Sequence, residues 1–219
     1  MIDYRSLTLK KLNTPAFSHL KLLLFWPLYG LCFLLLERFA PLDFHPIECA
    51  LDAKIPFCEW FVPAYYFWFI YQIGMILYLL LTDREGFRLN AWFTILTYSI
   101  TVCIYVIYPS CQNLRPEVLP RDNLLTRIVA FLYVFDTNTN VCPSIHVLGS
   151  MAAMFAGLHD PHMQTIPWRI YWILACLLIC LSTVFLKQHS IIDVFAALAL
   201  AAPAYLLVYH TRLFRKGVH

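Results

Sequence analysis

A small set of charged and titratable side chains stands near the ends of long apolar segments in this chain. They are Arg115, His146, Lys187, His189 and Asp193. Transfer of a phosphoryl group needs cations that hold its oxygens, an in-line nucleophile and an acid for the leaving oxygen. These residue types supply all three functions. The sequence therefore indicates a phosphoryl-transfer site, provided that the apolar segments bring the five side chains together.

The spacing of His189 and Asp193 suits a nucleophile and its orienting partner. The two residues are four positions apart at the start of an apolar segment, so they share one face of a helix. Asp193 can accept the Nδ1–H of the imidazole and leave Nε2 free to attack phosphorus, which gives a phosphohistidine. His146, from another helix start, would protonate the leaving alkoxide and then activate water.

We expect two cations and the N-termini of two helices to bind the phosphate. Arg115 offers a planar fork suited to phosphate, and Lys187 offers a second point charge. Ser144 is a plausible N-cap, and the free N–H groups of a helix start bind anions. The segment that begins near His189 would contribute in the same way. No cluster of carboxylates accompanies the histidines, so we expect neither a metal nor another cofactor.

Each motif taken alone has a simpler interpretation. Arg115-Pro116 is an ordinary loop dipeptide, and Ser144 with His146 is an ordinary helix start. Lys187 is a typical snorkelling residue at a helix end. An aspartate inside an apolar run is costly and usually functional, which favours the site over a structural polar pair. The order of the motifs and their placement on one side favour it further.

The composition predicts an integral membrane protein with a single domain over residues 1–219. Hydrophobic residues make up 61% of the chain and charged residues 13%, with a mean hydropathy of +0.66; soluble domains carry about 25% charge. The expected fold class is all-α, a bundle of six transmembrane helices with an interfacial helix between the third and the fourth. The apolar runs place the six helices at about 20–37, 60–81, 89–108, 144–158, 169–187 and 189–210.

Three of the apolar segments need comment. The first run lacks a small-residue cleavage pattern and is interpreted as a retained anchor rather than a removed signal. The fourth is short for a full span. The interfacial helix is expected from Leu124 to Val134, where apolar residues near Arg121 and Arg127 suit a helix that lies in the membrane surface.

The basic residues predict the orientation. Ten Lys and Arg residues fall on the side of both termini, and six fall on the other side. The positive-inside rule then places the termini in the cytoplasm and the motifs on the extracytoplasmic face of the cell membrane. The ten are Arg5, Lys10, Lys11, Lys21, Arg84, Arg88, Arg169, Arg212, Arg215 and Lys216.

Four of the eight cysteines lie in connecting segments on the side of the motifs. They show no zinc-like spacing. Disulfides between Cys49 and Cys58, or between Cys111 and Cys142, would form if that side is oxidising. Free thiols are the equally simple alternative, and the sequence leaves both open.

Together the motifs resemble those of the type 2 phosphatidic acid phosphatase superfamily. That family has Lys-x6-Arg-Pro, then Pro-Ser-Gly-His, then Ser-Arg-x5-His-x3-Asp, and the resemblance covers residues 108–193. It implies His189 as nucleophile, His146 as acid and base, Asp193 as orienter, and Arg115 and Ser144 as phosphate ligands. Three positions depart from the pattern, since Tyr108 and Thr183 replace cations and Ile145 replaces glycine.

The resemblance implies a lipid phosphatase that hydrolyses a lipid phosphate or pyrophosphate. Pro-Ser-x-His with His-x3-Asp is also similar to the inositol phosphorylceramide and sphingomyelin synthases, which move a phospho-head group to a lipid alcohol. The loss of two cations suits their phosphodiester substrates, unless Lys187 replaces one cation. A third alternative is a non-enzymatic lipid-binding or transport protein. The expected partners are a phospholipid and the bilayer, with no nucleic acid, and a homodimer is left open.

Overall fold

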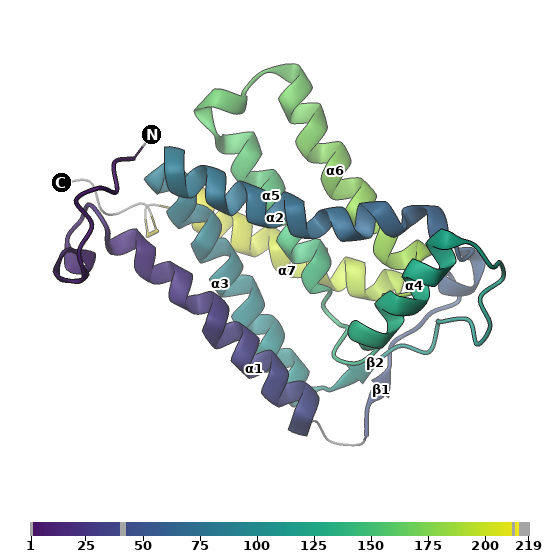
Figure 1. Cartoon of the computed structure of the whole chain (residues 1–219). Helices are drawn as coiled ribbons and strands as arrows, with labels where there is room; N and C mark the ends of the chain where they lie inside the picture. Colours follow the sequence, from purple (N-terminus) through teal and green to yellow (C-terminus); the bar gives the residue numbers. More distant parts are fainter. Residues whose placement is uncertain (1, 40–42, 212, 215–219) are drawn as a thin grey trace.

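The computed structural model describes residues 2–39, 43–211 and 213–214 and is helical, as the composition predicts (Figure 1). The expected helices are found with boundaries shifted by a few residues. The starts of the first and third helices shift most, and the third begins at Arg84 because the Asp83 side chain caps it by accepting from the Glu85 N–H. The helices are α1 (Phe25–Phe39), α2 (Val62–Thr82), α3 (Arg84–Ile107), α4 (Leu124–Phe135), α5 (Ile145–His159), α6 (Ile166–Phe185) and α7 (Ile191–His210).

Five segments within the described residues are long and apolar enough to cross a membrane. They are Ser18–Phe39, Glu59–Thr82, Arg84–Ile107, Ile166–Phe185 and Ile191–His210. The prediction of six spans is therefore confirmed only for five. The remaining expected span is α5, which has 15 residues. At 1.5 Å per residue it extends about 22 Å, shorter than the hydrocarbon layer of about 30 Å.

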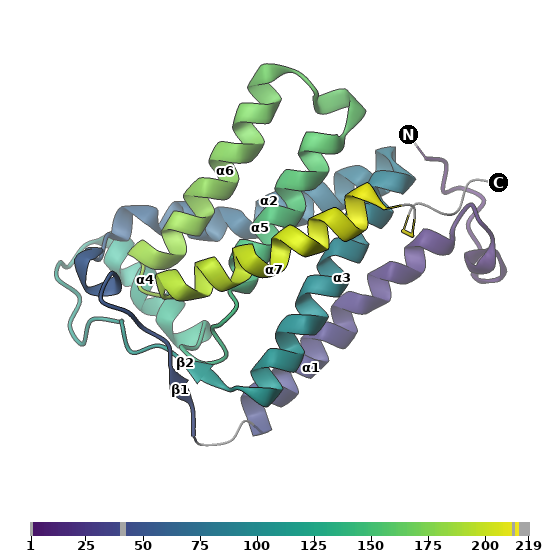
Figure 2. The same ribbon diagram turned by 180° about the vertical axis from the view of Figure 1, so that it is seen from behind.

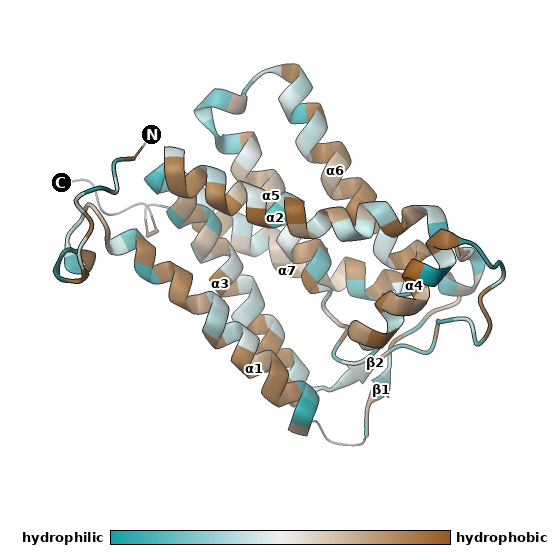
Figure 3. Ribbon diagram, in the orientation of Figure 1, coloured by the Kyte–Doolittle hydropathy of each residue, from teal (hydrophilic) through white to brown (hydrophobic). Residues whose placement is uncertain are grey.

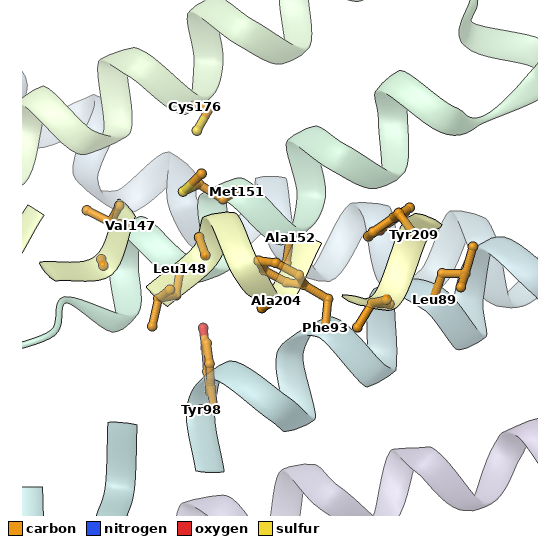
Figure 4. Close-up of a cluster of buried hydrophobic side chains, with 13 residues drawn as sticks. Leu89, Phe93, Tyr98, Val147, Leu148, Met151, Ala152, Cys176, Ala204 and Tyr209 are labelled. Carbon is orange, nitrogen blue, oxygen red and sulfur yellow. The ribbon is translucent and has the colours of Figure 1, made fainter. Parts of the chain in front are cut away.

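Helix α5 lies at the centre of the bundle. It packs against α2, α3, α6 and α7, whereas α1 lies at the periphery alongside α3 (Figures 1 and 2). Small residues such as Ala152 and Ala204 let the helices approach closely around it. Figure 4 shows the central core, to which α3 contributes Leu89, Phe93 and Tyr98, α5 contributes Val147, Leu148, Met151 and Ala152, and α7 contributes Ala204 and Tyr209.

Gly149 of α5 leaves no room for a side chain. An added Cβ would lie 2.6 Å from Gln72 Oε1, 2.6 Å from the Tyr98 hydroxyl and 3.0 Å from Trp68 Nε1. We expect Gly149→Ala to lower the stability in detergent by about 1–3 kcal/mol, the usual cost of overpacking. Thermal unfolding measures the effect. Gly74→Ala on α2, where nothing lies within 4 Å of the new Cβ, is the matched control; equal loss in both variants would contradict the close contact.

The bundle has two distinct ends. The described residues before α1 and after α7, and the turns between α2 and α3 and between α5 and α6, lie away from the end that carries β1, β2 and α4 (Figures 1 and 2). Strands β1 (His45–Pro46) and β2 (Ser110–Cys111) pair in parallel, so the loop after α1 runs beside the segment after α3. Of the basic residues assigned to the terminal side, Arg212, Arg215 and Lys216 lie outside the described residues.

Helix α4 is found where the interfacial helix is predicted, and its place in the membrane surface stays a prediction. Its apolar residues Leu124, Phe131, Val134 and Phe135 are exposed, and brown and teal residues alternate around it in Figure 3. An Asn123 and Thr126 capping box begins the helix. The opposite face contacts the bundle through a small cluster that includes Val129, Leu132, Tyr65 and Leu186. Helix α4 therefore covers the end of the bundle at which the motifs lie.

Candidate active site

The turn between α6 and α7 positions His189. The Thr183 carbonyl at the end of α6 accepts from the backbone N–H groups of Gln188 at 2.9 Å and His189 at 3.1 Å. Lys187 has a positive φ of 55°, so the turn closes in the left-handed region without a glycine. The chain then enters α7 with Ser190 as its N-cap. His189 is thus held between two helix ends.

Asp193 has two roles at the start of α7. Its Oδ2 accepts from the Ser190 N–H at 3.0 Å, which completes a capping box, and it lies 3.1 Å from Nδ1 of His189. Because an ionised carboxylate accepts only, Nδ1 carries the proton and Nε2 is the unprotonated nitrogen. This is the arrangement that the spacing predicts for a nucleophile and its orienter.

His146 faces His189 from the start of α5. Its Nδ1 lies 3.4 Å from Nε2 of His189, and the two side chains are only 6% and 5% exposed. The structure thus brings together residues 43 positions apart, as expected. Both histidine side chains are also more deeply buried than their positions at helix ends suggest.

Asp136 adds a second carboxylate to the histidine pair. It follows the end of α4, and its Oδ2 lies 3.8 Å from Nε2 of His146 and accepts from the Tyr65 hydroxyl. The order along the site is Asp193, His189, His146 and Asp136. Each histidine therefore has a carboxylate on its outer side and the other histidine on its inner side. Asp136 favours the protonated form of His146, but burial and the neighbouring His189 outweigh this effect and favour the neutral form.

Aromatic rings of α2 hold the His146 imidazole. The ring of Tyr65 lies 4.7 Å from it and the ring of Trp68 lies 4.6 Å from it, measured between centroids. These ring contacts restrict the imidazole, so its orientation depends on packing as well as on Asp136.

Arg115 reaches the site from the segment after β2. Its guanidinium donates to the Tyr133 carbonyl at 3.0 Å, the Asp136 carbonyl at 2.5 Å and Gln188 Oε1 at 2.5 Å, and it lies over the Tyr133 ring. Burial lowers the pKa of this guanidinium below its usual value, and Asp136 opposes the shift. It remains charged, because the unperturbed value is so high.

Two buried donors on the Arg115 and Gln188 side of the histidine pair lack an acceptor. They are Arg115 Nε and Gln188 Nε2. Each unpaired buried N–H costs about 1–3 kcal/mol, so such groups are usually satisfied. Both belong to residues that contact each other, and Gln188 adjoins His189. This pair of donors suits an anion that enters next to the nucleophile.

Lys187 does not serve as the predicted second cation of this arrangement. Its ammonium donates to the carbonyls of Asp52 at 2.8 Å and Ile55 at 2.5 Å, in the loop between α1 and α2. Burial lowers the pKa of this ammonium, and Asp52 opposes the shift. The side chain holds that loop against the turn, because the left-handed turn directs it away from the sequence-predicted position.

The start of α7 is occupied by a carboxylate of the same loop. Asp52 accepts from the Ile191 N–H at 2.9 Å and from the Ser190 hydroxyl at 2.7 Å. Burial alone would raise the pKa of Asp52, but these bonds and one from the Cys49 N–H outweigh it and lower that pKa. The prediction that both helix starts point at one phosphate therefore does not hold for α7, and for α5 it stays a prediction.

The remaining predicted site residues have structural contacts. Ser144 is buried and caps α5, with its Oγ accepting from the Val147 N–H at 3.4 Å. Ile145 packs against the central core, and its carbonyl accepts from the Tyr98 hydroxyl at 3.2 Å. The Tyr108 ring is half-exposed and stacks on His45, with 4.3 Å between centroids.

The eight cysteines are free thiols. Neither the Cys49 and Cys58 pair nor the Cys111 and Cys142 pair forms a disulfide, which is one of the two alternatives that the sequence leaves open. Within the described part of the chain, no group of three or more His, Cys, Asp or Glu side chains is placed to hold a metal ion.

Sequence reasoning missed four residues of the site, namely Asp52, Tyr65, Asp136 and Gln188. Gln188 adjoins His189 and could have been found by position alone. Asp136 could have been noticed in the sequence, because it is a charged residue that directly follows the apolar run of α4.

The arrangement as a whole can place a nucleophilic nitrogen, an acid and a planar cation around one anion. The chain matches no protein-family model, no curated protein and no solved structure.

Proposed function

We propose that this chain is a membrane enzyme of the type 2 phosphatidic acid phosphatase superfamily that hydrolyses a lipid phosphate or pyrophosphate. The observation that supports it best is the contact between His189 and His146, with Asp193 behind the nucleophile. The unpaired donors of Arg115 and Gln188 support an anionic substrate. The five apolar spans support a substrate that is itself a membrane lipid.

The proposed reaction has two steps. Nε2 of His189 attacks phosphorus, and the bond between phosphorus and the lipid oxygen breaks while His146 gives that oxygen a proton. Water, deprotonated by His146, then attacks the phosphohistidine, which releases inorganic phosphate and restores both histidines. Asp193 orients the nucleophile, and Asp136 stabilises His146 when it carries the extra proton. Arg115 binds the equatorial oxygens.

A second candidate is a lipid phosphotransferase that passes the phospho-head group to a lipid alcohol. One observation favours it. Lys187 is bonded to the carbonyls of Asp52 and Ile55, and Tyr108 and Thr183 are uncharged, so among the described residues Arg115 is the cation beside the histidine pair. A diester carries about one negative charge and a monoester nearly two at pH 7. A panel of lipids, with released phosphate and transferred head group measured separately, distinguishes the two reactions.

We expect the activity to persist in EDTA and to be inhibited by vanadate. Helix α5 and Arg115 already provide positive charge at the site, and vanadate resembles the five-coordinate transition state. Phosphate release from phosphatidic acid in detergent micelles measures both effects. Activity lost in EDTA and restored by Mg²⁺ or Zn²⁺ would contradict a reaction carried by side chains alone.

The proposed location of the site is the extracytoplasmic face of the cell membrane, with the termini in the cytoplasm. The test uses cysteine at Thr137, an exposed residue near the site, and at Glu85, an exposed residue near the opposite end. In a background with the native cysteines replaced by serine, an impermeant maleimide should label the first position and not the second in intact cells. The opposite pattern would reverse the orientation.

A further inference from the structure

The histidine pair is almost completely enclosed. His146 and His189 are 6% and 5% exposed, and Nδ1 of His146 lies 3.4 Å from Nε2 of His189. Phosphorus must itself come to about 3–3.5 Å from the attacking nitrogen before the new bond forms. Since His146 already occupies that distance, a phosphate reaches Nε2 only after an element that covers the pair has moved.

Helix α4 lies over this end of the bundle and has little buried packing. Its buried apolar residues are Val129 and Leu132, which pack in a small cluster with Val62, Tyr65 and Leu186. The opposite face of the helix is exposed, and Figure 1 shows α4 at the edge of the bundle. Helix α5, by contrast, is buried among four helices. A movement of α4 therefore separates few buried contacts, as is typical of segments that open locally.

The start of α4 is held by an acidic residue that precedes α2. Glu59 is buried, and its carboxylate accepts from Nε and Nη2 of Arg121, both at 2.6 Å, and from the Asn123 side chain at 3.0 Å. Two-point pairs of arginine with a carboxylate have a well-defined geometry. Among the described residues, no bond joins these three to the histidine pair or to Arg115. An anion at the histidines would therefore leave this end of α4 in place.

The other end of α4 is held by Arg115. Its guanidinium donates to the carbonyls of Tyr133 at 3.0 Å and Asp136 at 2.5 Å, in the last turn of the helix and just beyond it. Carbonyls at a helix end lack partners within the helix and together carry about half a negative charge. A phosphate carries a full charge or more and binds arginine through the same N–H groups. It therefore competes with the helix end for Arg115.

Asp136 moves with this end of α4. Its Oδ2 lies 3.8 Å from Nε2 of His146 and also accepts from the Tyr65 hydroxyl. A carboxylate at this position favours the protonated form of His146. His146 loses this carboxylate when α4 opens and regains it when α4 closes. Entry of the phosphate is thus favoured in the open arrangement, and proton transfer by His146 is favoured in the closed one.

We infer that α4 is a lid over the histidine pair, released when an anion takes Arg115 from the carbonyls of Tyr133 and Asp136. The lid pivots at Glu59 and opens at its Asp136 end. This inference rests on the proposed function, in which Arg115 binds the phosphate, and adds to it a conformational step that precedes the chemistry. Closure then returns Asp136 to His146 before the proton is transferred.

Thiol labelling measures the opening of this lid. Val129 faces the bundle from α4 and Val147 lies in the central core, and both are fully buried. In a background with the native cysteines replaced by serine, Val129→Cys and Val147→Cys are each reacted with a soluble maleimide. We expect orthovanadate to accelerate labelling at position 129 about tenfold or more, the scale of one displaced charged hydrogen bond. Labelling at position 147 should stay slow in both conditions.

Arg115→Ala tests the bonds that hold the lid closed. Added to Val129→Cys, it removes both bonds to the helix end, so labelling should be fast without vanadate and should not respond to it. Added to Val147→Cys, it should have no effect, which excludes general unfolding. Labelling at position 129 that neither vanadate nor Arg115→Ala accelerates, or equal labelling at both positions, would overturn the lid. Acceleration by Arg115→Ala alone would overturn its release by the anion.

A reversible bridge tests whether turnover needs the opening. Val62→Cys and Val129→Cys together place two thiols in the cluster between α2 and α4. A short bis-methanethiosulfonate joins them until dithiothreitol is added. We expect the bridge to lower hydrolysis of phosphatidic acid about tenfold or more, dithiothreitol to restore it, and the reagent to leave each single variant unaffected. Undiminished turnover of the bridged protein would refute the lid.

The lid and the proposed reaction fail separately in these experiments. Accelerated labelling at position 129, without hydrolysis of any lipid phosphate by the wild-type protein, would refute the reaction and leave the lid standing. Hydrolysis by wild type without accelerated labelling at position 129 would refute the lid and leave the reaction standing.

Discussion

His189→Asn should abolish phosphate release from phosphatidic acid, with a loss of about 10⁴-fold or more, because the nucleophile acts as a unit with its partners. Asparagine is the appropriate replacement because His189 is 95% buried and bonded to Asp193. The amide nitrogen can still donate to that carboxylate, so a polar group is not left unpaired. Wild type incubated with radiolabelled lipid should yield an acid-labile, base-stable phosphoprotein, and the variant should yield none.

The control for this experiment is His162→Asn. His162 is exposed and lies in the turn between α5 and α6, at the opposite end of the bundle. It should retain wild-type turnover and wild-type labelling. If His189→Asn kept more than about a tenth of the rate, the assignment of the nucleophile would be wrong.

Arg115→Ala should lower kcat/KM by about 10²-fold or more, the scale of one lost transition-state contact. Arg115→Lys should recover little of this loss, even though it keeps the charge. The guanidinium bonds Tyr133, Asp136 and Gln188 at once and still has an unpaired Nε, and an ammonium lacks this planar geometry. Kinetics on one monoester and one diester lipid measure the effect on each candidate reaction.

Arg127→Lys is the matched control for the arginine variants. Arg127 forms an exposed ion pair with Asp122 on α4, and such pairs contribute little to stability. Its kinetics should equal those of wild type. Full activity of Arg115→Lys would show that charge alone is used at this position, which would contradict the role given to the planar guanidinium.

The sequence alone predicts those parts of the structure that a local residue pattern determines. Apolar run length predicted the helices, and the four-residue spacing predicted the contact between His189 and Asp193. Helix parity predicted that His146 would lie at the same end. In each case the property depends on a few neighbouring residues or on the number of membrane crossings.

The rest of the site depends on contacts that no local pattern encodes. Lys187 looks like a phosphate ligand by position, but the left-handed turn directs it to the loop between α1 and α2. Asp136 lies near His146 only because α4 folds back over the bundle. The apolarity of α5 is ambiguous for a different reason, because this short helix is buried among four other helices and would be apolar whether or not it crosses the membrane.

The bond between Asp52 and Ser190 joins residues 138 positions apart at the start of α7. Lys187 bonds to the same loop from the other side of the turn. A change at Asp52 alone would leave the Ser190 hydroxyl and the Ile191 N–H without their partner. Over evolutionary time the two ends of this bond should therefore change together. The loop between α1 and α2 would then be inherited with the histidine turn, and grafting that turn into another scaffold would require the loop as well.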